Sequence, residues 1–539
     1  MQKCSIKTST TSASLFMGLD AGTQSLKASL IDEACHPVFE LVVQFDTDLP
    51  AFKTRGGVHH HADGLTVTSP PLLWVAALDL LLGRMKKAGL PLNRIVAVSG
   101  SGQQHGSVYL QPGMERILKT LKSSRRLKPQ LRDMFAVDAS PIWMDSSTSR
   151  QCRERDAALG GPQAVAELTG SRSYERFTGN QIARIYQEHP GSYLATERIA
   201  LVSSFMASLL IGAYAPIEPG DGAGMNLMNL RSRRWSPEAL ACTAPGLAAK
   251  LGPIVPSHTV IGILSPYYVD RYGFAPTCRV IAFSGDNPNS LAALRLERSG
   301  EIAISLGTSD TVFGALSAPK PSAVEGHIFG NPINPQGYMA LICYKNGSLT
   351  RESVRNAYAG RSWKRFEAAL AATSPGNRGK IGFYFKEPEI TPPVLKPGIH
   401  RFNAANRSVD SFKPEENIRA VVEGQLLSMR LHGNNIGLIP KKILATGGAS
   451  VNKGFLRIMA DVFGAPVYTG RGANSASLGA AYRALHGWRC ARARRFIPFT
   501  KVVQLPQPFE KVFDPDPADY RLYTRLLSRY AELERRVTG

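Results

Sequence analysis

The chain contains two similar segments, one near its start and one just past its middle. Residues 16–31 read FMGLDAGTQSLKASLI, and residues 301–316 read EIAISLGTSDTVFGAL. Each has an apolar strand pattern, then a Gly-Thr pair with further polar residues, then a second strand pattern. A unit that recurs once per half predicts two similar domains, and short glycine-bearing turns between strand patterns predict β-hairpins.

The rest of the chain alternates strand and helix patterns. Residues 94–100, 279–286 and 441–448 are apolar runs that end at glycine or Gly-Asp, which is typical of fully buried strands. Helical patterns lie between them, and the last, over residues 519–537, places its apolar side chains three or four positions apart. This alternation predicts an α/β protein with largely parallel sheets.

Composition narrows the class of protein. Of 539 residues, 43% are hydrophobic and 20% are charged, as in ordinary globular proteins. The longest apolar stretch, residues 72–82, contains Asp79 and is shorter than the roughly 20 residues that a membrane span needs. Seven scattered cysteines without a CxxC pair argue against a disulfide framework or a zinc site. We therefore expect a cytoplasmic protein without membrane attachment.

The formal net charge of +22 raises the question of a nucleic-acid partner. The basic residues are dispersed, however, and the densest groups, at 119–132, 231–234 and 489–495, are not interleaved with the aromatic side chains that single-strand binders use. We expect a solvated basic surface and no specific nucleic acid, with a nucleic-acid role for the basic surface as the alternative.

Several common motifs are missing. The sequence has no GxxxxGK[ST], HExxH or GxSxG pattern, and the glycines of GSGQQHG at 100–106 are one residue too far apart for the dinucleotide fingerprint. These absences argue against the commonest nucleotide-binding and hydrolase classes.

The two Gly-Thr turns offer a different phosphate site. Backbone N–H groups and hydroxyls at Gly22-Thr23 and Gly307-Thr308 could surround anionic oxygens, and Asp20 could hold Mg²⁺. A strand followed by Gly447-Gly448 leaves open backbone on which a planar ring could lie. Each feature also has a plain structural explanation, as a hairpin turn or a tight strand-to-helix turn, and it is the symmetric pair that favours phosphate binding.

Asp286 is the candidate catalytic base. It ends a buried strand and precedes Asn287-Pro288, and ligands of open α/β sheets bind at the carboxyl ends of strands. Its carboxylate could accept a proton from a substrate hydroxyl while Asn287 orients it, or it could simply cap the helix that follows. His105 also follows a buried strand and could bond a sugar hydroxyl, or be a satisfied half-buried histidine.

Taken together, these motifs resemble a known family. GLDAGTQSLKASLID, GQQHG, IWMDSST, GDGAGMNLMNL, SGDNPNSLA, SLGTSDT and ATGGASVN occur in the order seen in the FGGY carbohydrate kinases. GGVHHHADGLTVTSP, GSRSYERFTGNQIARIY and EGHIFGNP further resemble the eukaryotic members that phosphorylate D-xylulose. The resemblance spans about residues 15–490.

The resemblance implies a fold and a set of site residues. The fold would be two ribonuclease-H-like domains of the actin/hexokinase type facing across a cleft, and we place them at residues 1–283 and 284–539. The sugar would contact His105, Arg176, Asp286 and Asn287, with Asp286 as the base; the nucleotide would contact Thr23, Gln24, Gly307, Thr308, Ser309, Trp363, Gly447, Gly448 and Asn452; the metal would bind Asp20.

The implied reaction is ATP-dependent, Mg²⁺-assisted phosphorylation of D-xylulose to D-xylulose 5-phosphate. Two departures from the family pattern bear on the sugar preference and not on the reaction class. Residues 181–186 replace a Pro-Lys-Leu-x-Trp stretch, and Asn474 or Ser475 replaces a frequent acidic residue. The alternatives are phosphorylation of ribulose or glycerol, or an actin- or chaperone-like ATPase without a sugar. The expected partners are small molecules, and the chain could form a homodimer.

Overall fold

The computed structural model describes residues 14–470, 476–505 and 508–538, so Asn474 and Ser475 lie outside the described residues. The chain divides by its contacts into two compact units. The first consists of residues 1–297, 329–337 and 474–506, and the second of residues 298–328, 338–473 and 507–539. This division by contacts does not follow the single boundary that we expected between residues 283 and 284. That boundary between the two kinase domains stays a prediction.

The first unit is built on a mixed sheet with the strand order β12-β13-β6-β1-β2-β3, and β14 also pairs with β6. The pairs β1–β2 and β2–β3 are antiparallel, whereas β1–β6 and β6–β13 are parallel. The predicted hairpin is confirmed, because β1 and β2 are joined by residues 22–24 alone. The strands are β1 (Leu15–Ala21), β2 (Ser25–Asp32), β3 (Pro37–Gln44), β6 (Ile95–Gly102), β12 (Val260–Ile263), β13 (Arg279–Ile281) and β14 (Ser284–Gly285).

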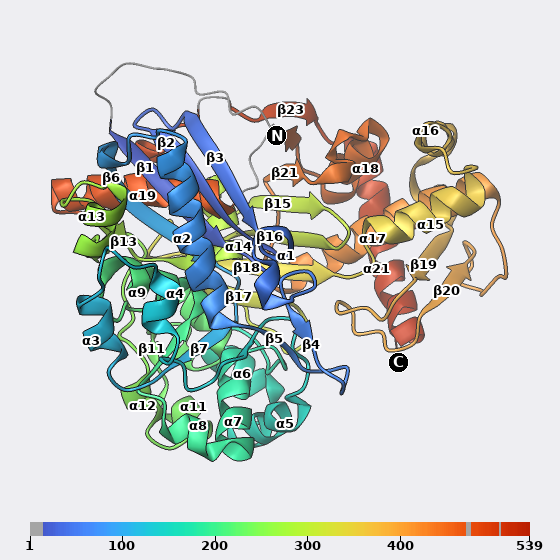
Figure 1. Cartoon of the computed structure of the whole chain (residues 1–539). Coiled ribbons are helices and arrows are strands. Elements are labelled where there is room, and N and C mark those ends of the chain that lie inside the picture. The colour runs from blue at the N-terminus through green and yellow to red at the C-terminus, as the bar shows by residue number, and fades with distance from the viewer. Residues whose placement is uncertain (1–13, 471–475, 506–507, 539) are drawn as a thin grey trace. The chain divides into compact units, whose positions relative to one another are not determined.

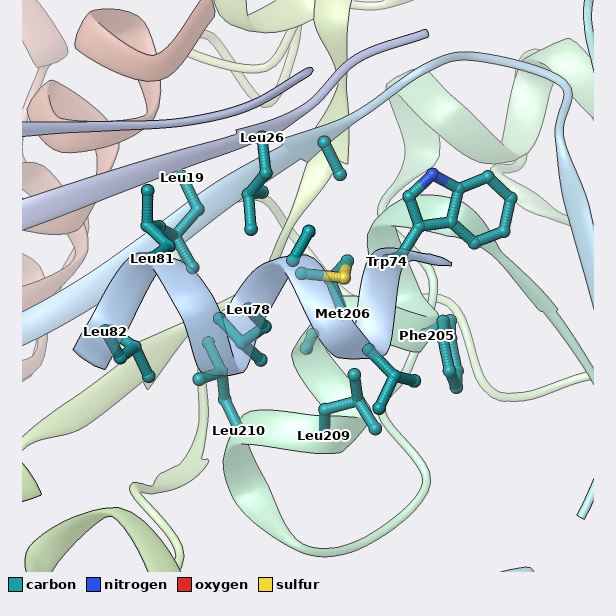
Figure 2. Packing of buried hydrophobic residues seen from close by; sticks show 14 of the residues in the cluster. Leu19, Leu26, Trp74, Leu78, Leu81, Leu82, Phe205, Met206, Leu209 and Leu210 are labelled. Atoms are coloured by element: carbon teal, nitrogen blue, oxygen red, sulfur yellow. The ribbon is translucent and has the colours of Figure 1, made fainter. Parts of the chain in front are cut away.

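Helices α2 (Pro71–Lys87) and α19 (Ala476–Ala493) cover opposite faces of this sheet (Figure 1), as the alternation along β1 requires. Leu19 joins the apolar cluster that includes Leu78 and Leu81 of α2 (Figure 2). The neighbouring Gly18 faces α19, where a Cβ atom would lie 1.9 Å from the carbonyl oxygen of Ser477. Two helices packed on a fully buried strand explain why β1 reads as a continuous apolar run.

The second unit repeats this topology. Its sheet has the order β17-β18-β16-β15-β21-β22-β23, in which β15–β16 and β16–β18 are antiparallel and β15–β21 and β21–β22 are parallel. The internal repeat therefore codes for the same sheet pattern twice, which confirms two similar α/β domains. The strands are β15 (Glu301–Leu306), β16 (Asp310–Leu316), β17 (His327–Gly330), β18 (Tyr338–Tyr344), β21 (Lys442–Thr446), β22 (Val467–Thr469) and β23 (Glu510–Phe513).

The expectation of largely parallel sheets was only half right. Each sheet has three adjacent parallel strands, β1-β6-β13 in the first unit and β15-β21-β22 in the second, and antiparallel pairs on both sides of them. The hairpins at the Gly-Thr turns account for part of this, because a short connection can join only antiparallel strands. The predicted strand at 279–286 is also interrupted, since Ala282 and Phe283 separate β13 from β14. Among the described residues, no helix has the length and apolar character needed to cross a bilayer.

The remaining elements surround these two sheets. In the first unit they are β4 (His59–His60), β5 (Val67–Ser69), β7 (Ser107–Leu110), β8 (Ser140–Pro141), β9 (Arg198–Leu201), β10 (Met228–Asn229), β11 (Arg234–Trp235), α1 (Phe45–Asp48), α3 (Met114–Lys119), α4 (Leu127–Leu131), α5 (Ser149–Ala158), α6 (Pro162–Thr169), α7 (Thr178–Glu188), α8 (Pro190–Leu194), α9 (Val202–Ile211), α10 (Pro219–Gly222), α11 (Pro237–Ala241), α12 (Leu247–Lys250), α13 (Pro266–Tyr272), α14 (Asp286–Ala293) and α20 (Phe499–Val502). In the second they are α15 (Ser348–Tyr358), α16 (Trp363–Ala372), α17 (Pro414–Asn435), α18 (Lys453–Phe463), α21 (Pro517–Thr538), β19 (Ile381–Phe385) and β20 (Gly398–Phe402).

Candidate active site

Three neighbouring strands of the first unit end in register. Ser101 of β6 pairs with Asp20 of β1 on one side and with Ser284 of β14 on the other, and both pairings are parallel. The residues that follow these strands therefore emerge at one edge of the sheet, where open α/β folds bind ligands. This register brings Asp20, the 103–105 segment and Asp286 to the same edge.

Asp286 is fixed at the first turn of α14. Its Oδ1 atom accepts hydrogen bonds from the backbone N–H of Asn287, at 2.9 Å, and from Asn287 Nδ2, at 3.1 Å. Burial, and then the charge of Asp20, raise the pKa of Asp286 to about 7, against the opposing effect of backbone N–H groups. Gly285 holds the N-cap position, so Asp286 does not cap this helix. A carboxylate with such a pKa can take up a proton near neutral pH.

Gln104 is a site residue that the sequence analysis missed. Its Oε1 atom accepts a hydrogen bond of 2.9 Å from Asn287 Nδ2, which leaves its amide N–H groups available as donors. The side chain lies against Gly285, where a Cβ atom would be 2.3 Å from Gln104 Cγ. The only signal in the sequence was the polar run that follows the buried strand at 94–100.

His105 is a buried, neutral imidazole. Its Nδ1 atom lies 2.9 Å from the carbonyl oxygen of Gly224, which can only accept, so the proton is on Nδ1 and Nε2 carries the lone pair. Burial, and then the charge of Arg176, lower the pKa of His105 to about 3. Its ring packs on Phe177 with centroids 4.5 Å apart, and the Arg176 guanidinium lies over the Tyr174 ring at 4.8 Å. The predicted sugar residues thus gather in one unit.

Asp20 is a buried carboxylate at the end of β1. Within the part of the chain that the structure describes, its Oδ1 atom has no hydrogen-bond partner. Burial raises the pKa of Asp20, against the attraction of Lys27. An unpaired, buried carboxylate oxygen suits a hard cation such as Mg²⁺, which binds through one or two carboxylates together with phosphate oxygens. The described residues contain no cluster of three or more His, Cys, Asp or Glu side chains that could hold a metal by themselves.

The first Gly-Thr turn is packed by a second segment. The amide of Gly22 bonds the carbonyl of Ser25 at 3.0 Å and closes the hairpin. Gly57, with a φ of +79°, lies against the turn so closely that a Cβ atom would be 1.9 Å from the carbonyl oxygen of Thr23. The Thr23 hydroxyl accepts a hydrogen bond of 2.8 Å from Trp143 Nε1, and Gln24 is exposed.

The second Gly-Thr turn, in the other unit, is held in a similar way. The backbone N–H of Ser348 donates to the Gly307 carbonyl at 2.9 Å. Behind the exposed Thr308 and Ser309, the buried Asp310 accepts two hydrogen bonds from Arg351, at 2.6 and 3.0 Å. The hydroxyls and amides at the tip therefore stay accessible while the base of the turn is fixed.

The predicted adenosine residues also lie in the second unit. Gly447 has a φ of +84°, and a Cβ atom there would lie 2.6 Å from the Leu306 carbonyl oxygen, whereas Gly448 faces open space. The Asn452 side chain caps α18 by accepting a hydrogen bond of 2.8 Å from the backbone N–H of Phe455. Asn452 therefore has a structural role beside its predicted contact with adenosine. Trp363 is 41% exposed beneath the Arg355 guanidinium, 4.5 Å away, and keeps a ring surface for stacking.

These two units define a sugar kinase fold with a carboxylate at the end of a central strand. Sequence models of the FGGY family of carbohydrate kinases match the chain, the N-terminal domain model at residues 137–293 and the C-terminal one at 302–488. A xylulose kinase from Mus musculus is 52% identical over 97% of this chain and 94% of its own, and xylulose kinase 2 from Arabidopsis thaliana is 48% identical over 91% and 90%. The chain therefore belongs to the FGGY family and is a carbohydrate kinase.

Solved structures agree on the fold. The crystal structure of a ligand-bound xylulose kinase from Lactobacillus acidophilus superposes with a TM-score of 0.78, covering 98% of this chain and 99% of that one at 19% identity. At this identity the likeness concerns the fold alone.

Proposed function

We propose that this chain transfers the γ-phosphoryl group of ATP to the terminal hydroxyl of D-xylulose, giving D-xylulose 5-phosphate and ADP. The observation that carries the proposal is the constellation at the end of β6 and β14, where Asp286, Asn287, Gln104 and His105 point hydrogen-bonding groups of both kinds at one edge of the sheet. The names of the mouse and Arabidopsis relatives support D-xylulose as the sugar.

Each residue has an assigned role. Asp286 accepts the proton of the attacking sugar hydroxyl. The hydroxyl oxygen forms a bond to the γ-phosphorus while the bond between that phosphorus and the oxygen of the leaving ADP breaks. His105 Nε2 accepts a hydrogen bond from a sugar hydroxyl, and Gln104 Nε2 donates one. Arg176 and Asn287 complete the sugar contacts.

The nucleotide is assigned to the Gly-Thr turns and the glycine pair. Thr23, Gln24, Gly307, Thr308 and Ser309 donate to phosphate oxygens, and Trp363, Gly447, Gly448 and Asn452 receive the adenosine. Asp20 would hold Mg²⁺, whose positive charge, when it is bound, neutralises the phosphate oxygens. We place the activity in the cytoplasm; the absence of a specific nucleic-acid partner and the formation of a homodimer stay predictions.

A sugar panel tests the substrate. Purified chain is assayed for ADP release with ATP and Mg²⁺ in the presence of D-xylulose, D-ribulose, glycerol or no sugar. We expect kcat/KM for D-xylulose to exceed that for the other sugars by about tenfold or more. A preference for ribulose or glycerol would assign another reaction of the same family, and ADP release that no sugar changes would indicate an ATPase without a sugar substrate.

The variant Asp286→Asn tests the base. We expect kcat to fall by about 100-fold or more while the Kd for D-xylulose, measured by calorimetry, stays within a few-fold of the parent. Asp133→Asn, at an exposed position outside the site, is the matched control and should keep full activity. Turnover of Asp286→Asn close to that of the parent would refute the assignment of the base.

A further inference from the structure

The hydrogen bond between Trp143 and Thr23 joins residues that are far apart in the chain. Trp143 Nε1 donates to Thr23 Oγ1 at 2.8 Å, although the Trp143 side chain is 44% exposed. An indole N–H can only donate, so one lone pair of the hydroxyl is occupied. The single proton of Thr23 must then point away from the indole, into one of the two remaining staggered positions.

Trp143 is itself held in a rigid turn. The amide of Asp145 bonds the Ile142 carbonyl at 2.9 Å, and the buried Asp145 carboxylate accepts from the backbone N–H of Val67 at 3.1 Å and from Gln181 Nε2 at 2.8 Å. Because a buried carboxylate with several donors is costly to move, the indole has little freedom to leave its position.

The backbone of Thr23 is equally constrained. The amides of Gly56 and Gly57 donate to the Asp46 carboxylate at 2.6 and 3.0 Å, and Gly57 packs directly on the Thr23 carbonyl. The backbone contacts set the position of the turn, but they do not orient the hydroxyl. In the described part of the first unit, the bond from Trp143 supplies that orientation.

We propose that Trp143 is a positioning residue for the first phosphate-binding turn and acts through the Thr23 hydroxyl. By occupying one lone pair, it directs the hydroxyl proton towards a phosphate oxygen of the nucleotide. The inference rests on the proposed function only for the identity of that anion. Helix α7 connects this turn with the sugar residues, since Gln181 bonds Asp145 and Thr178 Oγ1 donates to the His105 carbonyl at 2.9 Å.

A double-mutant cycle tests the proposal. Trp143→Phe keeps an aromatic ring but removes the N–H, and Thr23→Val removes the hydroxyl. We expect each to raise the Kd for ATP with Mg²⁺, measured by calorimetry without sugar, and the KM for ATP by roughly 3- to 10-fold, with a smaller change in the KM for the sugar. The double variant should match Thr23→Val alone, because Trp143 acts through the group already lost.

Two further variants separate positioning from a general effect on the turn. Thr23→Ser keeps the hydroxyl and should lose less ATP affinity than Thr23→Val. Met144→Leu, an exposed neighbour in the same turn as Trp143, is the control and should change neither the Kd nor the KM for ATP. Three results would each overturn the inference. The Kd changes of Trp143→Phe and Thr23→Val could multiply in the double variant, the Kd for ATP could be unchanged in Trp143→Phe, or Met144→Leu could lose as much ATP affinity as Trp143→Phe.

The two proposals fail in different ways. The calorimetric cycle needs ATP binding but no turnover, so an error in the sugar assignment would leave it interpretable. If the Trp143→Phe variant turns over D-xylulose normally and has an unchanged KM for ATP, the positioning role is overturned, whereas the proposed function still stands.

Discussion

The imidazole of His105 donates its Nδ1 proton to the carbonyl oxygen of Gly224, 2.9 Å away, and so presents Nε2 as an acceptor. His105 has a φ of +70°, which only a locally constrained segment tolerates in a residue with a side chain. The sharp turn after β6 is therefore arranged so that the ring faces Gly224, where a Cβ atom would lie 2.9 Å from the imidazole.

Removing the acceptor should weaken sugar binding specifically. We expect His105→Leu to raise the KM for D-xylulose about tenfold, since a sugar hydroxyl loses its partner, while the KM for ATP changes less than about twofold. Steady-state kinetics with each substrate varied in turn measures both. His36→Leu, at an exposed histidine of the same unit, serves as the control. Equal increases in both KM values would contradict a role limited to the sugar.

The pKa of Asp286 predicts the pH dependence of the reaction. The base must be ionised, and burial together with the charge of Asp20 raises its pKa to about 7. We therefore expect kcat/KM for D-xylulose to be low near pH 5.5, to rise through about pH 7 with a slope of one, and to level off above pH 8. Initial rates from pH 5.5 to 8.5 would measure this, and a flat profile would rule out a base with that pKa.

Gly447 and Gly448 form a matched pair for testing the second unit. Gly447 combines φ of +84° with ψ of 177°, a region almost restricted to glycine, and packs on the Leu306 carbonyl. We expect Gly447→Ala to destabilise the fold by about 1–3 kcal/mol and to lower the melting temperature.

Gly448→Ala should behave in the opposite way. Because a Cβ atom at this position meets open space, the melting temperature of Gly448→Ala should equal that of the parent. The KM for ATP should rise, since the added methyl group displaces the adenosine. An unchanged KM for ATP would remove Gly448 from the nucleotide site, and a large loss of stability would contradict the open surface.

A buried histidine predicts how the stability of the second unit depends on pH. His432 Nε2 lies 3.1 Å from Glu534 Oε2 and its Nδ1 lies 3.4 Å from Glu325 Oε1. Burial opposes the charged form, but the hydrogen bonds and charges of Glu325 and Glu534 outweigh it and raise the pKa of His432 to about 9. Burial also opposes the charged form of Glu325, but hydrogen bonds from His432, Ser322 and Asn435 outweigh it and lower the pKa of Glu325 to about 2.

Because the pKa of His432 is higher in the folded than in the unfolded chain, its contribution to stability is greatest at pH values below the unfolded pKa, near 6.5. This contribution is lost as the pH rises through about 9. We expect His432→Gln to be less stable than the parent by roughly 2–3 kcal/mol at pH 6, and the difference to shrink towards pH 9.5. Urea unfolding at several pH values, with His400→Gln in the same unit as the control, measures it. A difference that does not vary with pH would refute the charged pair.

Much of the fold could be predicted from the sequence because its signals are local. The continuous apolar runs of β1, β6 and β21 identified buried strands, and the two Gly-Thr turns were confirmed as hairpin tips. The last helix, expected over 519–537, spans Pro517–Thr538. Asp286 stood out because Gly-Asp follows a buried strand, and strand ends are where ligands bind.

The contacts that complete the site had no such signal. Gln104 meets Asn287, and Trp143 meets Thr23, only because separate strands end in register and loops from different parts of the chain pack on them. Residues 474–506 group with the first unit for the same reason, because α19 packs on β1.

The sequence by itself determined two similar α/β halves, the strand ends that carry the carboxylates and the resemblance to a kinase family, because periodicity and turn chemistry act between neighbours along the chain. Only the tertiary structure decided which polar groups hydrogen-bond to one another and which way His105 and Thr23 direct their protons. Those outcomes depend on burial and on distances of a few ångströms between residues remote in sequence, which no local pattern encodes.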